Sequence, residues 1–377
     1  MTVSNCHSPS GTGTVTEMQQ VRDDAFQDRL TGVLLGTAVG DAIGLPAEGL
    51  SPRRRQRLLP GPWRQRFLCG RGMISDDTEH TLLVAQSLLT HPDDATAFGR
   101  DLARRLRWWF RGLPAGIGLA TARACLKLWL GFSPERSGVY SAGNGPAMRS
   151  ALLGAHFFDD QGAIERLVTA STRLTHRDPR ALTGALAVAR LAAWAVQHGP
   201  AESPSAELVG DLLAKLAPTD REWGELVDKT LAGWAHGESV AAFASSLGLG
   251  GGVTGYVDHT VPVAVYAWLR HYGDFRAALE AALDCGGDTD TTGAIVGALT
   301  GRTVGAGGIP NDWIAEIIDW PRSLWLLRNV ASRLCQQKHD GRTLGPVRYL
   351  WPAVLPRNLQ FLFVVLLHGF RRLAPPY

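Results

Sequence analysis

The chain has 377 residues, a hydrophobic fraction of 45%, a charged fraction of 19% and a formal net charge of +3. This composition excludes a disordered chain, and the near-balanced charge argues against a nucleic-acid-binding protein, which usually carries a strong basic footprint. The length suffices for one large domain or two ordinary ones. The five cysteines are odd in number and form no CxxC pair, so we expect no disulfide framework or zinc site and favour the cytoplasm.

The first segment, residues 1–24, is rich in Ser, Thr and Gly, and we interpret it as a flexible N-terminal arm. It lacks the charged start and apolar stretch of a signal peptide. From about Ala25 the pattern becomes helical. Asp41 and polar flanks indicate a buried helix here rather than a membrane segment. Four glycines recur in it at intervals of four, as a stripe of small residues that lets a second helix approach closely: Gly32, Gly36, Gly40 and Gly44.

Helical patterns continue along the chain, and neither strand alternation longer than a few residues nor a fixed-period repeat interrupts them. The chain is therefore predicted to fold as an all-α bundle of about a dozen helices, with one core over residues 25–341. The predicted helical segments after the first are residues 77–90, 95–110, 179–196 and 237–252, two helices within 256–287 and a pair within 310–334.

The C-terminal segment, residues 342–377, contains five prolines, and we expect it to pack as an appendage on the preceding domain. Its apolar run LQFLFVVLLHGF is about a dozen residues long, whereas a membrane-spanning helix needs roughly 20. We therefore expect no membrane span. The run is interpreted as a buried C-terminal helix, with an interfacial helix as the alternative.

Two short clusters of carboxylates each precede a predicted helix, in SDDTEH (75–80) and in CGGDTDTT (285–292). Capping of a helix N-terminus is one explanation, but a cap needs only one carboxylate. Crowded carboxylates repel one another, and neither cluster contains Lys or Arg. Hard divalent cations bind such oxygen donors. The clusters together supply Ser75, Asp76, Asp77, Thr78, Asp288, Asp290 and Thr291.

Three other features are candidates for a ligand site. Glu48 follows the glycine-rich helix, although an ordinary loop glutamate is the alternative. The segment YSAGNGPAMRS (140–150) is typical of a glycine-rich turn that presents N–H groups to phosphate or ribose. A plain loop is the alternative. His176 and Tyr256 are each either a ligand contact or a structural residue. If Tyr256 is a ligand contact, its ring is a candidate to stack on adenine.

The ordered set of segments resembles the ADP-ribosylglycohydrolase family, of the dinitrogenase reductase-activating glycohydrolase type, which includes ADP-ribosyl-arginine hydrolases. The resemblance covers roughly Leu30 to Gly305. The chain departs from the family at Ser75, where Thr is frequent, and at Ala142, where many relatives have an aromatic residue. The matching segments are GTAVGDAIGLPAE, SDDTE, YSAGNGPAMR, LTHRDPRALTGA, GYVDHTV and GGDTDTTGAIVGALTG.

The resemblance implies a compact, single-domain orthogonal helical bundle around a binuclear centre of two Mg²⁺ or Mn²⁺ ions. One ion would be held by Ser75, Asp76, Asp77 and Asp290, and the other by Asp288, Asp290 and Thr291. The catalytic residues it implies are Glu48, Asp77, Asp288 and Asp290. The residues implied to bind ADP-ribose are Ser141, Gly143, Asn144, Gly145, His176 and Tyr256.

The implied function is metal-dependent hydrolysis that removes ADP-ribose from modified protein side chains, with arginine as the first choice. Its partners would be ADP-ribosylated proteins and ADP-ribose, and protection against an ADP-ribosylating toxin, as an immunity protein, is one cellular role. The alternative is a non-catalytic ADP-ribose-binding protein, or a partner that occludes a toxin with residues 1–24.

Overall fold

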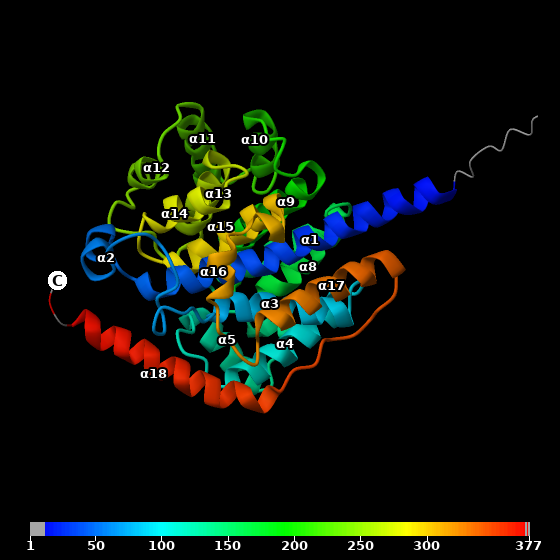
Figure 1. Ribbon diagram of the computed structural model, residues 1–377, viewed down its shortest axis with the longest axis horizontal. Helices are drawn as coiled ribbons and strands as arrows, with labels where there is room; N and C mark the ends of the chain where they lie inside the picture. Colours follow the sequence, from blue (N-terminus) through cyan, green and yellow to red (C-terminus); the bar gives the residue numbers. More distant parts are fainter. Residues whose placement is uncertain (1–11, 374, 376–377) are drawn as a thin grey trace, which may run out of the picture.

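A computed structural model describes residues 12–373 and 375 of the chain (Figure 1). These residues form 18 α-helices and no strand, which confirms the all-α prediction. Short connecting helices raise the number above the predicted dozen. The α-helices are α1 Thr12–Gly44, α2 Pro52–Leu58, α3 Asp76–Thr90, α4 Ala95–Arg111, α5 Leu119–Trp129, α6 Pro134–Ser137, α7 Ala151–His156, α8 Gln161–Arg173, α9 Pro179–His198, α10 Ala206–Ala214, α11 Arg221–Ala235, α12 Val240–Ser246, α13 Val257–Arg270, α14 Phe275–Leu283, α15 Thr289–Val304, α16 Asn311–Ala315, α17 Leu324–Asp340 and α18 Val354–Arg372.

The closest helix pair in the fold joins α1 to α15, which lie side by side in the middle of the molecule (Figure 1). Glycine faces glycine along this antiparallel contact. A Cβ atom added at Gly36 would lie 2.0 Å from the carbonyl oxygen of Gly297, and one at Gly40 would lie 1.9 Å from that of Gly293. The predicted small-residue stripe of α1 is therefore confirmed, and its partner is a second glycine stripe on α15.

The core surrounds this pair. Every residue of α15 from Thr289 to Thr303 is buried, and α9, α13 and α14 pack against it. Because α1 ends beside the start of α15, the loop that carries Glu48 lies next to the carboxylates of the second acidic cluster. Close packing of the two glycine stripes thus brings residues some 240 positions apart to one place.

The N-terminal helix begins at Thr12, so residues 12–24, which the sequence places in a flexible arm, belong to α1. This part of the chain contains Glu, Met, Gln and Arg, which favour helices, and it extends a helix that is already formed. The remainder of the predicted arm, residues 1–11, lies outside the described residues.

The C-terminal helix α18 follows a non-helical connection and lies along the outside of the domain (Figure 1). Only 33% of an apolar window in Trp351–Arg372 is buried, so the expectation of a buried helix is wrong. By length and composition this stretch and Asp23–Ala47 could each cross a membrane. The apolar window of Asp23–Ala47 is entirely buried in the fold, as a core helix is.

Candidate active site

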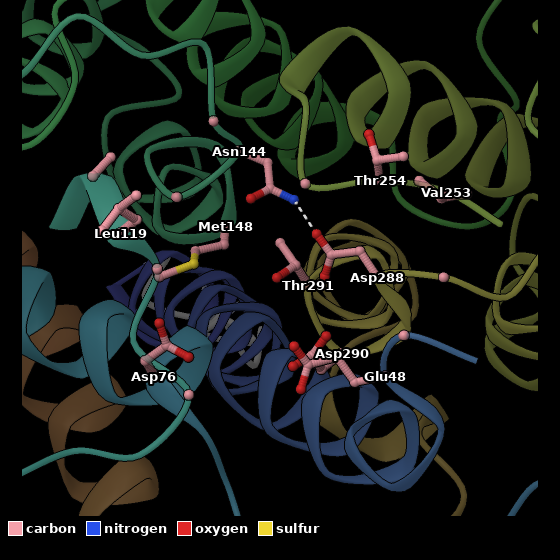
Figure 2. Close-up of a pocket in the computed structure, with 18 of the residues that line it drawn as sticks. Glu48, Asp76, Leu119, Asn144, Met148, Val253, Thr254, Asp288, Asp290 and Thr291 are labelled. Atoms are coloured by element: carbon pink, nitrogen blue, oxygen red, sulfur yellow. Dashed lines mark hydrogen bonds between the residues drawn. The ribbon is translucent and has the colours of Figure 1, made fainter. Parts of the chain in front are cut away.

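A pocket with a volume of about 640 Å³ opens where the first turns of α3 and α15 meet four loops (Figure 2). Its lining contains carboxylates on one side and glycine-rich backbone on the other. Ten of the residues singled out from the sequence line it, namely Glu48, Asp76, Ser141, Gly143, Asn144, Gly145, His176, Asp288, Asp290 and Thr291. Ser75 and Asp77 lie behind this lining, and Tyr256 lies outside it.

Backbone hydrogen bonds join the loops that form the rim of the pocket. Gly49 N donates to Gly287 O at 2.7 Å, Gly287 N donates to Leu50 O at 2.8 Å, and Asp288 N donates to Val253 O at 2.8 Å. Gly287 has φ +80°, and a Cβ atom there would lie 1.9 Å from Val253 O. Glycine is therefore required at this position both by conformation and by space.

Asp41 on α1 positions the first acidic cluster. It is fully buried, and its carboxylate accepts hydrogen bonds from Ser75 N at 2.9 Å and from the N–H and hydroxyl of Thr78. It thereby holds the turn that begins α3. Burial raises the pKa of Asp41 to about 6. This role of Asp41 was not predicted from the sequence, although an aspartate inside a stripe of glycine and apolar residues was its signal.

Asp77 connects the first turn of α3 with that of α15. Its Oδ2 accepts from the hydroxyl of Ser75 at 3.2 Å and from that of Thr291 at 3.4 Å. Ser75 is also the N-cap of α3, as the capping interpretation predicts. Capping and clustering therefore occur together, and three of the predicted metal-ligating residues meet at the base of the pocket.

Asp288 is the N-cap residue of α15, but its side chain makes no capping hydrogen bond. Instead, Oδ2 accepts from Asn144 Nδ2 at 2.7 Å (Figure 2), and the same amide donates to Thr260 Oγ1 at 2.9 Å. The second acidic cluster is thus held from the glycine-rich segment 140–150. A predicted ligand-binding residue here orients a predicted metal ligand.

Glu48 reaches the rim of the pocket beside Asp290 (Figure 2). Its pKa is raised by desolvation and by the charge of Asp288, and lowered by Arg372. Arg372 donates to the carbonyl oxygen of Glu48 at 2.7 Å, so α18 holds this part of the rim.

Negative charge is crowded at the base of the pocket. Desolvation raises the pKa values of Asp76, Asp77 and Asp290 well above the usual value, and the charges of neighbouring carboxylates raise them further. The buried oxygens Asp77 Oδ1 and Asp290 Oδ1 have no hydrogen-bond partner among the residues that the structure describes. A positive charge at this place would reduce the repulsion among the carboxylates and would give the two unpaired oxygens a partner.

The donor set fits a hard divalent cation, since carboxylate and hydroxyl oxygens are the ligands that Mg²⁺ and Mn²⁺ prefer. Among the described residues, no group of three or more His, Cys, Asp or Glu side chains converges closely enough to hold an ion as they stand. Binding would therefore need the carboxylates to turn toward a common point. The donors available are Ser75, Asp76, Asp77, Asp288, Asp290 and Thr291.

His176 lines the pocket opposite the carboxylates and packs against the glycine-rich turn. A Cβ atom at Gly143 would lie 2.8 Å from His176 Nε2, and one at Gly145 would lie 3.2 Å from Cε1, so both glycines make room for the ring. Its Nδ1 lies 2.9 Å from Thr175 Oγ1. Burial lowers the pKa of His176 to about 3, so the ring is neutral near pH 7.

The predicted ligand contact Tyr256 does not line this pocket. Its backbone pairs with Gly143, but its hydroxyl accepts from Arg180 at 3.0 Å and its side chain faces a separate hollow beside Glu222 and His259. Tyr256 is the N-cap residue of α13, and its side chain lies against Arg180 instead of entering the pocket. Met148, Leu119 and Thr254 line the pocket without having been singled out from the sequence.

The fold is an all-α bundle, and its acidic pocket is bordered by glycine-rich loops. The ADP-ribosylglycohydrolase family pattern matches residues 22–342, and the chain belongs to that family. Family membership supports hydrolysis of ADP-ribose linkages.

Two relatives and one solved structure illustrate the similarity. The chain is 26% identical to the ADP-ribosyl-[dinitrogen reductase] glycohydrolase of Rhodospirillum rubrum, over 78% of this chain and 91% of that protein. It is 27% identical to the ADP-ribosylarginine hydrolase Tri1 of Pseudomonas putida, over 77% and 74% respectively. A solved ADP-ribosylglycohydrolase-related protein complex matches with a TM-score of 0.61 and 27% identity, over 84% of this chain and 99% of that one.

Proposed function

We propose that this chain removes ADP-ribose from modified side chains of cytoplasmic proteins, with ADP-ribosyl-arginine as its main substrate. The proposal rests on one observation, that the acidic clusters and the candidate ADP-ribose-binding residues line the same pocket. The carboxylates Asp76, Asp288 and Asp290 face the same space as Asn144 and His176. The similarity to the ADP-ribosylarginine hydrolase of Pseudomonas putida supports arginine as the linked residue.

The substrate is proposed to lie with its distal ribose over the carboxylates and its diphosphate along the glycine-rich turn. Gly143 and Gly145 leave backbone accessible there, and Ser141 adds a hydroxyl. The neutral ring of His176 can exchange hydrogen bonds with ribose hydroxyls but cannot donate a proton as an imidazolium. These groups bind and orient the sugar.

Cleavage of the bond between ribose and the side chain builds positive charge on the sugar, which the carboxylates stabilise. Glu48 is placed at the rim and has a raised pKa, so it is suited to take up or release the proton of the reacting water or of the leaving group. Asp41 and Asn144 hold the acidic clusters in position without touching the bond that breaks.

We further propose that two Mg²⁺ or Mn²⁺ ions are needed, held by the oxygen donors of the two acidic clusters. When bound, such cations supply Lewis-acid chemistry and neutralise the carboxylates. The unpaired oxygens of Asp77 and Asp290 support this proposal.

The direct test is release of ADP-ribose from an arginine-ADP-ribosylated protein, with Mg²⁺, with Mn²⁺ and with chelator. Serine-linked ADP-ribose and O-acetyl-ADP-ribose serve as matched substrates. We expect release from arginine that stops in chelator. Release from serine alone would reassign the linkage, and no release from any substrate by folded, metal-loaded protein would favour a non-catalytic ADP-ribose-binding protein. A toxin-directed immunity role predicts release from the toxin's own modified target.

A further inference from the structure

The C-terminal helix α18 packs on the domain through a mixed face and leaves most of its apolar side chains exposed. Its polar side chains Arg357, Asn358, His368 and Arg372 point toward the domain and are bonded to it. Phe361 and Val364 are buried on the same side, whereas most of the other apolar side chains point away from the domain. The family pattern matches residues 22–342, so α18 lies outside the matched part of the chain.

Hydrogen bonds hold this orientation along the whole helix. Asn358 Nδ2 donates to Gly112 O at 2.8 Å, His368 Nε2 lies 2.8 Å from Phe67 O, and Arg357, buried at the helix start, pairs with Asp319 and Glu79.

At the other end, Arg372 donates to Glu48 O at 2.7 Å and to Pro46 O at 3.0 Å. Because bonds occur at both ends and in between, α18 cannot rotate to bury its apolar side without breaking them.

The apolar side, which we call the outer face of α18, consists of eight exposed large side chains and runs along the length of the helix, with Gln360 as a polar residue among them. Each member exposes between 39% and 72% of its surface. Scattered single apolar residues are ordinary on a protein surface, but a contiguous patch of this size marks an interaction site. The outer face consists of Leu355, Leu359, Leu362, Phe363, Leu366, Leu367, Phe370 and Leu373.

Positive charge flanks the outer face. Asp340 is the last acidic residue of the chain, whereas Arg348 precedes the helix and Arg371 is exposed at its end. The short helix α2 abuts the same end, where Arg54 Nη2 donates to Arg372 O at 2.9 Å, and it carries further exposed arginines. The surface therefore combines an apolar face with basic ends.

We propose that the outer face of α18 docks this protein on a membrane surface that contains anionic lipids. An amphipathic helix that lies in the plane of the interface has this composition, with Phe and Leu toward the acyl chains and arginines near the headgroups. Trp351 at the helix start is typical of the same boundary. Since α18 is bonded to the domain along its length, it lies on the membrane and does not span it.

Charge argues against a second copy of the chain as the occupant of the outer face. Two such faces packed together would bring arginines near arginines, with no carboxylate between Gly341 and Tyr377 to pair with them. Among the exposed residues of α18 only Gln360 and Arg371 are polar, whereas protein interfaces usually carry about one hydrogen bond per 100–200 Å².

The test is flotation of the full chain with two kinds of vesicle, phosphatidylcholine alone and phosphatidylcholine with phosphatidylglycerol. The double variant Leu366→Ser/Phe370→Ser removes two large side chains of the outer face. The matched control Leu130→Ser/Leu208→Ser removes exposed leucines elsewhere. All four positions are exposed, so the thermal unfolding temperature of each variant is expected to stay near that of the parent.

We expect the parent and the control to float with the anionic vesicles. The outer-face variant should bind them at least about tenfold more weakly. Added salt should weaken binding to the anionic vesicles. The proposal is overturned if the folded parent floats with neither vesicle, or if the control loses as much binding as the outer-face variant. Equal binding to both vesicles contradicts the role of charge. A parent dimer in sedimentation that the outer-face variant dissociates, without vesicle binding, assigns the face to a second copy.

Discussion

Asn144 Nδ2 donates a hydrogen bond of 2.7 Å to Asp288 Oδ2, which joins the glycine-rich segment to the second acidic cluster. The same amide donates to Thr260 Oγ1 at 2.9 Å, so both of its hydrogens are used. Asn144 is 8% exposed, which leaves its side chain little freedom to turn. A residue of the glycine-rich segment therefore decides where a carboxylate of the acidic cluster points.

Replacement of Asn144 by Ala is expected to lower the rate of ADP-ribose release by about 10–100-fold, the range found when partners of metal-ligating carboxylates are removed. The loss should be smaller at saturating Mg²⁺, because the displaced carboxylate weakens cation binding. Steady-state rates over a range of Mg²⁺ concentrations measure it. Asn329→Ala, which changes a half-buried asparagine of α17 that bonds only to the carbonyl of Trp325 on its own helix, is the control. An unchanged Mg²⁺ dependence would show that Asn144 acts on the substrate instead.

The substitution Asp290→Asn should separate activity from stability. It removes one charge from a crowded, buried cluster, so we expect release to fall by about 100-fold or more. In chelator, however, the thermal unfolding temperature should rise, since desolvation and neighbouring carboxylates oppose the charged form of Asp290. Calorimetry of the variant in chelator measures this, with Asp228→Asn at an exposed position as the control. A lower unfolding temperature would contradict the inferred repulsion.

The stability of the metal-free protein should fall as the pH rises. Folding raises the pKa of Asp41 to about 6 and raises those of Asp76, Asp77 and Asp290 as well, chiefly through desolvation. The folded chain then binds more protons than the unfolded chain. The contribution of these four carboxyls to the free energy of unfolding is therefore greatest below the unfolded pKa of about 4 and declines as the pH passes the raised values.

The measurement is the thermal unfolding temperature in chelator at about pH 5 and about pH 8, on either side of the raised pKa of Asp41. We expect the lower value at the higher pH, and recovery when Mg²⁺ is added at that pH. An unfolding temperature that Mg²⁺ leaves unchanged at the higher pH would argue against a cation among these carboxylates.

Replacement of Gly36 by Ala should destabilise the fold strongly, because the added Cβ atom would lie 2.0 Å from Gly297 O in the contact between α1 and α15. We expect a loss of about 3 kcal/mol in the free energy of unfolding. The control is Gly224→Ala in α11, where no atom lies within 4 Å of the added Cβ atom. There a gain of about 0.5–1 kcal/mol is expected from helix propensity. Urea denaturation of both variants compares them, and equal effects would refute the close-packing explanation.

The sequence by itself determined the helical class, the glycine stripe of α1 and the two acidic clusters. These features are local, since helical periodicity, glycine spacing and adjacent carboxylates can each be recognised within a few turns of chain. Most residues singled out for the ligand site, such as Glu48, Asn144 and His176, also line the pocket. Their order along the chain carried the resemblance to the family.

Only the tertiary structure decided how these features meet. Asp41 was not recognised as a positioning residue because its partners, Ser75 and Thr78, lie more than 30 residues away. Tyr256 lies outside the pocket because the start of α13 turns its side chain toward Arg180. The orientation of α18 also depends on distant groups, since long-range ion pairs and hydrogen bonds, rather than helical periodicity, decide which of its two faces turns inward.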